Sequence, residues 1–385
     1  MEPDGRTTIC FPFVGDTVGG SHLSVHGLID RLDRRRFRVI IVPQVRGGAI
    51  ATLFAGNELH AGPDLGVRFP PGEPFGPGKA LRALSALVPQ VRFLRRERVD
   101  IVHTNDGGTH ARWALAARLA GARLVWHHRG DPGALGLRTL APLLADRVLA
   151  VSSFALPRRR WWSASARAEV LHSPFDATIE VDRRAARTAL LREAALPEDA
   201  VLLGYFGSFI NRKRPIAFVE AIARLRRIVP DRPVIGLMFG EADDPRMALA
   251  LERRIVELDV TRNVRLMGYR TPGAFWIGAC DQLVVPAVGE PFGRTLVEAM
   301  LVGTPVVATR SGGNVEALRE GRLGLLVAPD DPAALAEGCA QLIHEPAATR
   351  ARAAFAQGDA RQRFGAEHHC ARVSQIYTEL VGRAA

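Results

Sequence analysis

The chain has 385 residues, of which 47% are hydrophobic and 24% are charged. These proportions are typical of folded globular proteins and exclude a mainly disordered chain, a collagen-like chain and a coiled coil. At roughly 100–200 residues per domain, the length predicts two domains. The net charge of +11 is uneven: residues 1–178 hold 24 basic and 15 acidic side chains, whereas residues 179–385 hold 27 and 25. The first half therefore either faces an anionic partner or carries a solvated basic surface.

Cysteine usage and hydropathy bear on the cellular setting. The four cysteines form no C-x-x-C pair and no Cys/His group with zinc spacing. The first residues show no basic region followed by an apolar stretch, and no run of about 18 uncharged apolar residues occurs. We therefore expect a cytoplasmic protein, which could still contact the inner face of a membrane.

Short apolar segments alternate with longer helical patterns along the whole chain. In the first half, the predicted strands are 7–14, 38–42, 101–103, 124–127 and 147–151, and the predicted helices are 20–32, 80–96 and 109–120. In the second half, the predicted strands are 201–206, 234–239, 265–267, 282–285 and 305–308, and the predicted helices are 216–228, 246–258 and 295–301. Fully apolar strands joined by helices predict parallel sheets covered on both faces. The fold class is therefore α/β, with two Rossmann-like domains.

The domain boundaries follow from the same pattern. We expect an N-terminal domain over residues 1–178, which ends in the loop after a short strand at 169–171. A second domain is expected over residues 179–363, and it opens with a charged helix at 182–195. Residues 364–385 hold a last helix, at about 366–381, which can pack back on the N-terminal domain.

Residues 289–316, GEPFGRTLVEAMLVGTPVVATRSGGNVE, carry the strongest chemical signal. Glu290 follows a predicted strand, and Glu298 lies in the first turn of the helix that Thr295 opens. The backbone N–H groups of residues 292–295 form an anion site at that helix N-terminus. A carboxylate on each side of a phosphate-sized site suits a sugar diphosphate, with one acid near sugar hydroxyls and the other near a ribose. Alternatively, both glutamates are simply acids that the helix dipole favours.

A second segment, residues 204–215 (GYFGSFINRKRP), also follows a strand and precedes a helix. Its Arg212 and Lys213 can clamp a diphosphate, or they can form a solvated basic loop. Lys213 is one of only two lysines in the chain.

Two weaker segments lie in the first half. Gly19 and Gly20, in the loop FVGDTVGGSHLS, would let a ligand approach the backbone closely, although their spacing does not match the NAD fingerprint. The segment WHHRGDP places two histidines, His127 and His128, at the end of a strand, where α/β sheets bind ligands. Core or surface histidines are the alternative.

Together these segments resemble the retaining, nucleotide-sugar-dependent glycosyltransferases of group 1, a family-4-like group with the GT-B fold. The resemblance covers about residues 7–380 and is most specific where EPFGRTLVEAM is followed by GTPVVA. SGGNVEAL and GLLVAPDDPAAL then continue in the expected order. The resemblance implies two Rossmann-like domains whose parallel sheets face a central cleft, with the acceptor bound by the N-terminal domain and the donor by the second domain.

The resemblance also implies roles for individual residues. Glu290, His128 and Lys213 are the implied catalytic residues: Glu290 contacts the donor sugar, His128 lies near the reacting sugar and Lys213 binds the pyrophosphate. Glu298 binds the ribose. The other implied donor-binding residues are Gly19, Gly20, Ser208, Arg212, Gly268, Tyr269, Phe292, Gly293, Arg294 and Thr295.

Two features bear on how the leaving diphosphate is stabilised. The family often has an arginine where this chain has Ser208, so we expect Arg212 or Arg294 to supply the missing charge. No D-x-D sequence occurs in the chain. We therefore expect cationic side chains and helix dipoles, without a required metal or other cofactor, to stabilise the diphosphate.

The expected activity is transfer of a sugar, with retention of configuration, from a UDP-sugar to a hydroxyl of a small-molecule or lipid-linked glycan acceptor, as in glycan or natural-product biosynthesis. One alternative is a nucleotide-sugar epimerase of the same double-Rossmann fold, and another is a catalytically silent scaffold. Nucleic acid is not an expected partner, because the basic residues come without a recognition module.

The acceptor side gives two hints. The sequence RRRWW at 158–162 either contacts an anionic membrane or forms a helix with one tryptophan in the core and its arginines in water. The Gly/Pro-rich residues 61–79 are a candidate acceptor-side loop.

Overall fold

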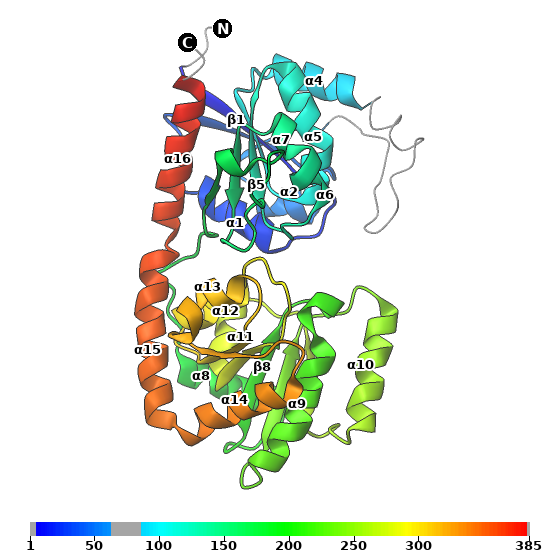
Figure 1. The fold of residues 1–385 in the computed structure, drawn as a ribbon, viewed down its shortest axis with the longest axis vertical. Helices are drawn as coiled ribbons and strands as arrows, with labels where there is room; N and C mark the ends of the chain where they lie inside the picture. Colours follow the sequence, from blue (N-terminus) through cyan, green and yellow to red (C-terminus); the bar gives the residue numbers. More distant parts are fainter. Residues whose placement is uncertain (1–4, 63–85, 383–385) are drawn as a thin grey trace. The chain divides into compact units, whose positions relative to one another are not determined.

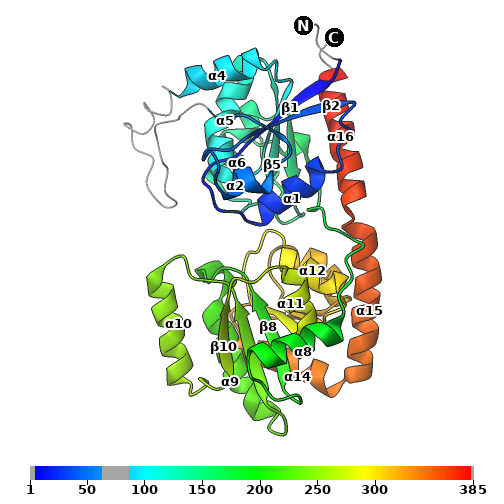
Figure 2. The same cartoon turned by 180° about the vertical axis from the view of Figure 1, so that it is seen from behind.

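The structure, a computed structural model, describes residues 5–62 and 86–382. The chain divides into two compact units. The first unit runs to Phe175 and takes up the chain again at Ala366, and the second unit is Asp176–Gly365. Each unit is built on a parallel sheet with helices on both faces, which confirms the predicted α/β fold class (Figures 1 and 2).

The sheet of the first unit has the strand order β3-β2-β1-β4-β5-β6-β7 among the described residues. Its strands are β1 (Thr7–Pro12), β2 (Phe37–Val42), β3 (Glu58–Leu59), β4 (Ile101–Thr104), β5 (Arg123–His128), β6 (Arg147–Ala150) and β7 (Ala168–Val170). Its helices are α1 (Gly20–Ile29), α2 (Ala49–Leu53), α4 (Leu87–Arg96), α5 (Gly107–Ala120), α6 (Leu135–Thr139), α7 (Ala141–Leu144) and α16 (Ala366–Gly382).

The two faces of this sheet bury separate apolar clusters. On one face, α1 and α16 pack against alternate residues of β1, including Ile9 and Phe11. On the other face, Trp113 of α5 and residues of α4, α6 and α7 pack against Cys10 and Trp126. Burial on both faces explains why the strands contain almost uninterrupted apolar residues.

The second unit has the strand order β10-β9-β8-β11-β12-β13. Its strands are β8 (Val201–Phe206), β9 (Val234–Phe239), β10 (Val264–Gly268), β11 (Gln282–Val285), β12 (Val306–Thr309) and β13 (Leu325–Val327). Its α-helices are α8 (Arg183–Glu193), α9 (Pro215–Ile228), α10 (Pro245–Glu257), α11 (Gly273–Ala279), α12 (Arg294–Leu301), α13 (Gly313–Ala317), α14 (Pro332–His344) and α15 (Pro346–Arg363). Helices α9, α10 and α14 cover one face, and α8 and α11 cover the other.

Aspartate caps fix the start of several of these helices. The side chains of Asp182, Asp244 and Asp331 accept hydrogen bonds from backbone N–H groups in the first turns of α8, α10 and α14. Each cap satisfies donors that a helix N-terminus leaves unpaired. In α10 and α14 a proline follows the cap, where its missing N–H costs nothing.

Most predicted strands and helices are confirmed to within a few residues, but the segment 157–162 differs from one of its two interpretations. It contains no helix, and Trp161 and Trp162 are 96% and 45% exposed. The interpretation of a helix with a core tryptophan is therefore wrong. Residues 63–79 of the candidate acceptor-side loop lie outside the described residues. No helix of the described chain combines the length and apolar character needed to cross a membrane.

Buried polar side chains attach α16 to the first unit, where it runs beside α1 (Figures 1 and 2). The hydroxyl of Tyr377 lies 2.5 Å from Nδ1 of His103, whose Nε2 lies 3.2 Å from Nδ1 of His127. On the same helix, Nδ1 of His369 donates to the carbonyl of His172 at 2.7 Å. Burial is the main cause that lowers the pKa of His103, His127 and His369, the last to about 3, so the rings stay neutral.

This arrangement predicts that acid destabilises the protein. In the unfolded chain the same histidines bind protons near pH 6.5, so the unfolded state binds more protons as the pH falls below that value. We expect the free energy of unfolding to be lower at pH 5 than at pH 8, with His369 alone contributing about 2 kcal/mol of the loss. Urea unfolding at pH 8, 6.5 and 5 measures it.

His369→Gln should flatten this pH dependence, whereas His368→Gln, at the exposed neighbouring position, should leave it unchanged. Equal stability of the wild-type protein at pH 5 and pH 8 would contradict the prediction.

Candidate functional site

The strand order of the second unit identifies where a ligand can approach its sheet. β8 and β11 are neighbours, and the chain continues from them toward opposite edges of the sheet. Loops that follow such neighbouring parallel strands leave a crevice at the carboxyl edge, the usual ligand position in open α/β sheets. The loops 207–214 and 286–293 meet there, and the N–H of Val288 donates to the carbonyl of Arg212 at 2.9 Å.

An ion cluster occupies this edge. The carboxylate of Glu290, which is 7% exposed, accepts a hydrogen bond from Nη1 of Arg212. Nζ of Lys213 lies 3.5 Å from the same carboxylate oxygen. Burial and, next, the negative charge of Glu290 raise the pKa of the Tyr205 hydroxyl. A buried carboxylate is costly unless it is paired, and here the two cations pair with it.

Two glycines permit this arrangement. Gly207 has a φ of +142°, and a Cβ there would lie 3.0 Å from Cδ of Lys213, whose side chain passes over it. Gly312 has a φ of +60°, and a Cβ there would lie 2.4 Å from the carbonyl oxygen of Glu290. The N–H of the next residue, Gly313, donates to that carbonyl at 2.7 Å. The backbone of Glu290 is therefore held from the loop after β12.

Helix α12 begins beside the same loop, with Gly293 at its N-cap. Because the helix starts at Arg294, Glu298 is its fifth residue and lies beyond the first turn, which corrects the sequence-based prediction. Nη2 of Arg294 lies 3.5 Å from Oε1 of Glu298. Burial raises the pKa of Glu298, and the charges of Arg294 and Lys213 oppose that shift. Lys213 thus acts electrostatically on both glutamates.

The remaining predicted donor-binding residues of this unit differ in whether their side chains are buried or exposed. Phe292 is buried with its ring edge-on to Phe364 at 5.5 Å between centroids, so it offers the site its backbone. The carbonyl of Ser208 accepts a hydrogen bond from the Tyr205 hydroxyl at 3.2 Å. Gly268 ends β10, and the next side chain, Tyr269, is 70% exposed. Thr295 follows Arg294 in the first turn of α12 and is half-buried.

The predicted residues of the first unit also follow strands. After β1, the N–H of Gly19 donates to Nδ1 of His22 at 3.1 Å, and Gly20 opens α1. At the end of β5, His128 is 4% exposed, and its Nε2–H donates to the carbonyl of Asp131 at 2.9 Å. Burial lowers the pKa of His128, so its ring is neutral near pH 7.

Sequence reasoning did not single out Arg129, which directly follows His128. Its guanidinium donates to Oγ of Ser173 at 3.0 Å and to Oδ1 of Asn105 at 3.4 Å. Its charge contributes to the lowered pKa of the buried His127. In the sequence, the feature that could have identified Arg129 is its position directly after two histidines at the end of a strand.

One cluster of the described residues has side chains that could hold a metal ion, namely Glu58, His60 and Glu97. Both carboxylates already pair with the guanidinium of Arg38. Those hydrogen bonds contribute to the lowered pKa of Glu58 and of Glu97. The cluster is thus stabilised without an ion.

Comparison with known proteins matches both halves of the chain to family models. Residues 200–345 match the model described as glycosyl transferases group 1, and residues 18–179 match the model described as glycosyltransferase family 4. The chain belongs to the group 1 glycosyltransferases. All of the candidate residues lie within the two matched regions of this family.

Two curated relatives illustrate the similarity. A D-inositol 3-phosphate glycosyltransferase of Kribbella flavida is 33% identical over 292 residues, which are 72% of this chain and 66% of the relative. One of Corynebacterium urealyticum is 33% identical over 193 residues, which are 49% of this chain and 45% of the relative. The match thus spans less than half of the length of the second relative.

Solved glycosyltransferase structures share the fold. HepE of Anabaena, solved in complex with UDP-glucose, superposes with a TM-score of 0.82 at 22% identity, covering 97% of this chain and 100% of that one. A glycosyltransferase of Rickettsia africae superposes with a TM-score of 0.77 at 17% identity, covering 98% and 99%. The group 1 glycosyltransferase chain therefore has the GT-B fold.

The contact between Gly312 and Glu290 generates a prediction. Gly312→Ala would place a Cβ in a left-handed conformation and against the Glu290 backbone. We expect it to lower the free energy of unfolding by more than about 1 kcal/mol, measured by urea denaturation. Gly358→Ala is the control, because a Cβ there, inside α15, meets nothing within 4 Å and alanine favours a helix. Equal stability of the two variants would contradict the role of Gly312.

Proposed function

We propose that the protein transfers a sugar from a UDP-sugar to a hydroxyl of an acceptor, with Glu290, Lys213 and His128 as catalytic residues. The observation that carries the proposal is the buried Glu290 carboxylate, held by Arg212 and Lys213. Further support comes from family membership and from HepE, whose structure is a complex with UDP-glucose.

The ion cluster suggests how a donor would bind. A diphosphate offers more negative charge than one carboxylate and would compete with Glu290 for Arg212 and Lys213. It would also accept hydrogen bonds from the N–H groups at the start of α12. Glu290, once released from part of its ion pair, would accept hydrogen bonds from the donor sugar, while Glu298 would bind the ribose. Gly268 and Tyr269 would lie at the base, and Gly19 and Gly20 would contact the donor from the first unit.

The same residues suggest a mechanism. The bond between C1 of the sugar and the diphosphate oxygen would break through an oxocarbenium-like state. The acceptor hydroxyl would form the new bond to C1 from the same face and pass its proton to the departing diphosphate, so the anomeric configuration is retained. The protein would contribute charge stabilisation and positioning. His128, neutral and fixed by its hydrogen bond to Asp131, would lie beside the reacting sugar. Because cationic side chains provide the charge, we propose that the reaction requires no metal.

The acceptor is proposed at the level of class. The two curated relatives described above carry the name D-inositol 3-phosphate glycosyltransferase, which favours a phosphorylated small molecule over a lipid-linked glycan. We place the reaction in the cytoplasm, in keeping with four free, buried cysteines. Peripheral contact with an anionic membrane through residues 158–162 stays a proposal, and no observation favours the epimerase.

A donor screen tests the function directly. Thermal shift and slow donor hydrolysis should respond to one UDP-sugar among UDP-, GDP-, ADP- and TDP-sugars, in the presence of EDTA. Glu290→Ala and Lys213→Ala should each lower the rate by at least about 10²-fold, because each removes a preorganised charge. Nuclear magnetic resonance of the product should show a retained anomeric configuration.

The control is Arg246→Ala, because Arg246 is exposed and pairs with Asp244. It should leave the rate unchanged. Wild-type turnover in Glu290→Ala or Lys213→Ala would refute the assigned roles, and loss of activity in EDTA that Mg²⁺ restores would refute metal independence.

A separate prediction concerns the position where the family often has an arginine. If Arg212 supplies the charge that Ser208 lacks, Arg212→Ala should weaken donor binding at least about tenfold. Ser208 is exposed, so it can be replaced by arginine without filling the core. Ser208→Arg in the Arg212→Ala background should then restore much of the affinity, measured by calorimetry. Unchanged affinity in Arg212→Ala would show that Arg212 does not bind the donor.

A further inference from the structure

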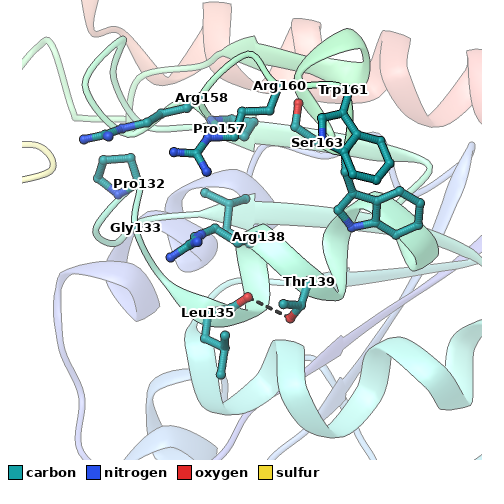
Figure 3. A pocket seen from close by; sticks show the side chains of 12 residues that line it. Pro132, Gly133, Leu135, Arg138, Thr139, Pro157, Arg158, Arg160, Trp161 and Ser163 are labelled. Carbon is teal, nitrogen blue, oxygen red and sulfur yellow. Dashed lines mark hydrogen bonds between the residues drawn. The ribbon is translucent and has the colours of Figure 1, made fainter.

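A cavity of about 400 Å³ lies in the first unit. It is enclosed by the loop after β5, by α6 and by the segment 157–163 (Figure 3). The residues that line it are Pro132, Gly133, Leu135, Leu137, Arg138, Thr139, Pro157, Arg158, Arg160, Trp161, Trp162 and Ser163. Its volume is within the range of small-molecule sites.

The lining is cationic, with no compensating acid. Arg138, Arg158 and Arg160 are exposed, and none of the lining residues is an aspartate or glutamate. Within the described part of the chain, their guanidinium groups have no ion pair or hydrogen bond. Three guanidinium groups at one cavity provide forked donors for an oxyanion, and planar guanidinium groups match phosphate oxygens well.

The same cavity has an apolar side. Trp161 is 96% exposed and Trp162 is 45% exposed, and their ring centroids are 6.1 Å apart. Leu135, at the start of α6, is 74% exposed. Figure 3 shows the indole of Trp161 at the end of the cavity opposite Pro132, toward which Arg138 and Arg158 extend. Large apolar side chains gathered in the open, beside cations, mark a binding surface for an amphipathic ligand.

The cavity is also connected to a proposed catalytic residue. The chain leaves β5 at His128, and four residues later it lines the cavity at Pro132. Between them, the carbonyl of Asp131 accepts the hydrogen bond from His128. A ligand in the cavity therefore rests on the loop that orients this histidine.

We propose that this cavity binds a phosphate ester. Arg138, Arg158 and Arg160 would hold the phosphate, and Trp161 would cover the organic part of the molecule. The proposal rests on the proposed function and deepens it, because it makes the acceptor a phosphorylated molecule. The phosphate ester can belong to a free polyol phosphate or to a lipid headgroup.

Direct binding in the absence of any donor tests this site. The probes are myo-inositol 1-phosphate and glycerol 3-phosphate, and the matched probes without phosphate are myo-inositol and glycerol. Calorimetry should show that at least one ester binds at least about tenfold more tightly than its parent alcohol, since the charge-assisted hydrogen bonds are lost with the phosphate. Equal binding of ester and alcohol would overturn the proposal.

Substitutions distinguish binding of the ester in the cavity from attraction by the net positive charge of the protein. Arg158→Ala with Arg160→Ala should weaken ester binding at least about tenfold, whereas Arg159→Ala should leave it unchanged. Arg159 is exposed and lies between the two, but it does not line the cavity. An equal effect of Arg159→Ala would mean that net charge alone attracts the ester, and the proposal would fail.

A second arm identifies the source of the phosphate. Vesicles of phosphatidylcholine with 20% phosphatidylinositol are compared with phosphatidylcholine alone. Binding of the free esters supports a polyol phosphate, and binding of the mixed vesicles alone, abolished by the Arg158 and Arg160 changes, supports a lipid headgroup. Binding of neither overturns the proposal.

The thermal shift by a UDP-sugar, measured on the same Arg158→Ala, Arg160→Ala protein, reports on the donor site separately. In the wild-type protein, a donor response without ester binding refutes this inference and keeps the proposed function. In the variant, weakened ester binding with an unchanged donor response supports the inference. Ester binding without any donor response or sugar transfer refutes the proposed function.

Discussion

The buried carboxylate of Glu290 is the constraint on which the rest of the second unit depends. A charge with so little exposure is tolerated because Arg212 and Lys213 compensate it. Bringing these residues together requires two loops at neighbouring strand ends, and glycines at Gly207 and Gly312 that leave room for a lysine side chain and a backbone carbonyl. The sheet order, the glycines and the cations are therefore parts of one arrangement.

In the first unit the buried polar groups are neutral, in contrast to the ion cluster of the second unit. Its polar residues lie under α16, where neutral histidines form a chain of close polar contacts from Tyr377 through His103 to His127. Burial keeps the pKa of these histidines low, so these contacts hold the helix through neutral groups. Charge is instead placed at the loops, at Arg129 and at the cavity arginines. Each unit thus collects charged side chains in the loops that follow its strands.

Most strands of the two sheets could be predicted from the sequence. Apolar runs such as residues 201–206 and 282–285 indicate strands that are buried on both faces of a sheet. Helix α15 was missed since it is rich in alanine and arginine and has few large apolar residues. Glu290 and Lys213 could be singled out from their segments. Their contact could not, because residues 213 and 290 are distant in sequence and the geometry depends on how two strands pair. The sequence did not decide whether Trp161 is exposed, because RRRWW is compatible with both an exposed segment and a helix with a core tryptophan.

The cavity beside α6 and the loop of His128 suggest why the first unit places three exposed arginines together with no acid among the lining residues. Exposed arginines without partners destabilise a folded chain through mutual repulsion. Arg138, Arg158 and Arg160 line the same cavity, so this repulsion is concentrated there. Selection for folding alone would favour an acid among them. Their position next to two exposed indoles is explained if an anionic ligand provides the missing charge beside the loop whose Asp131 carbonyl orients the ring of His128.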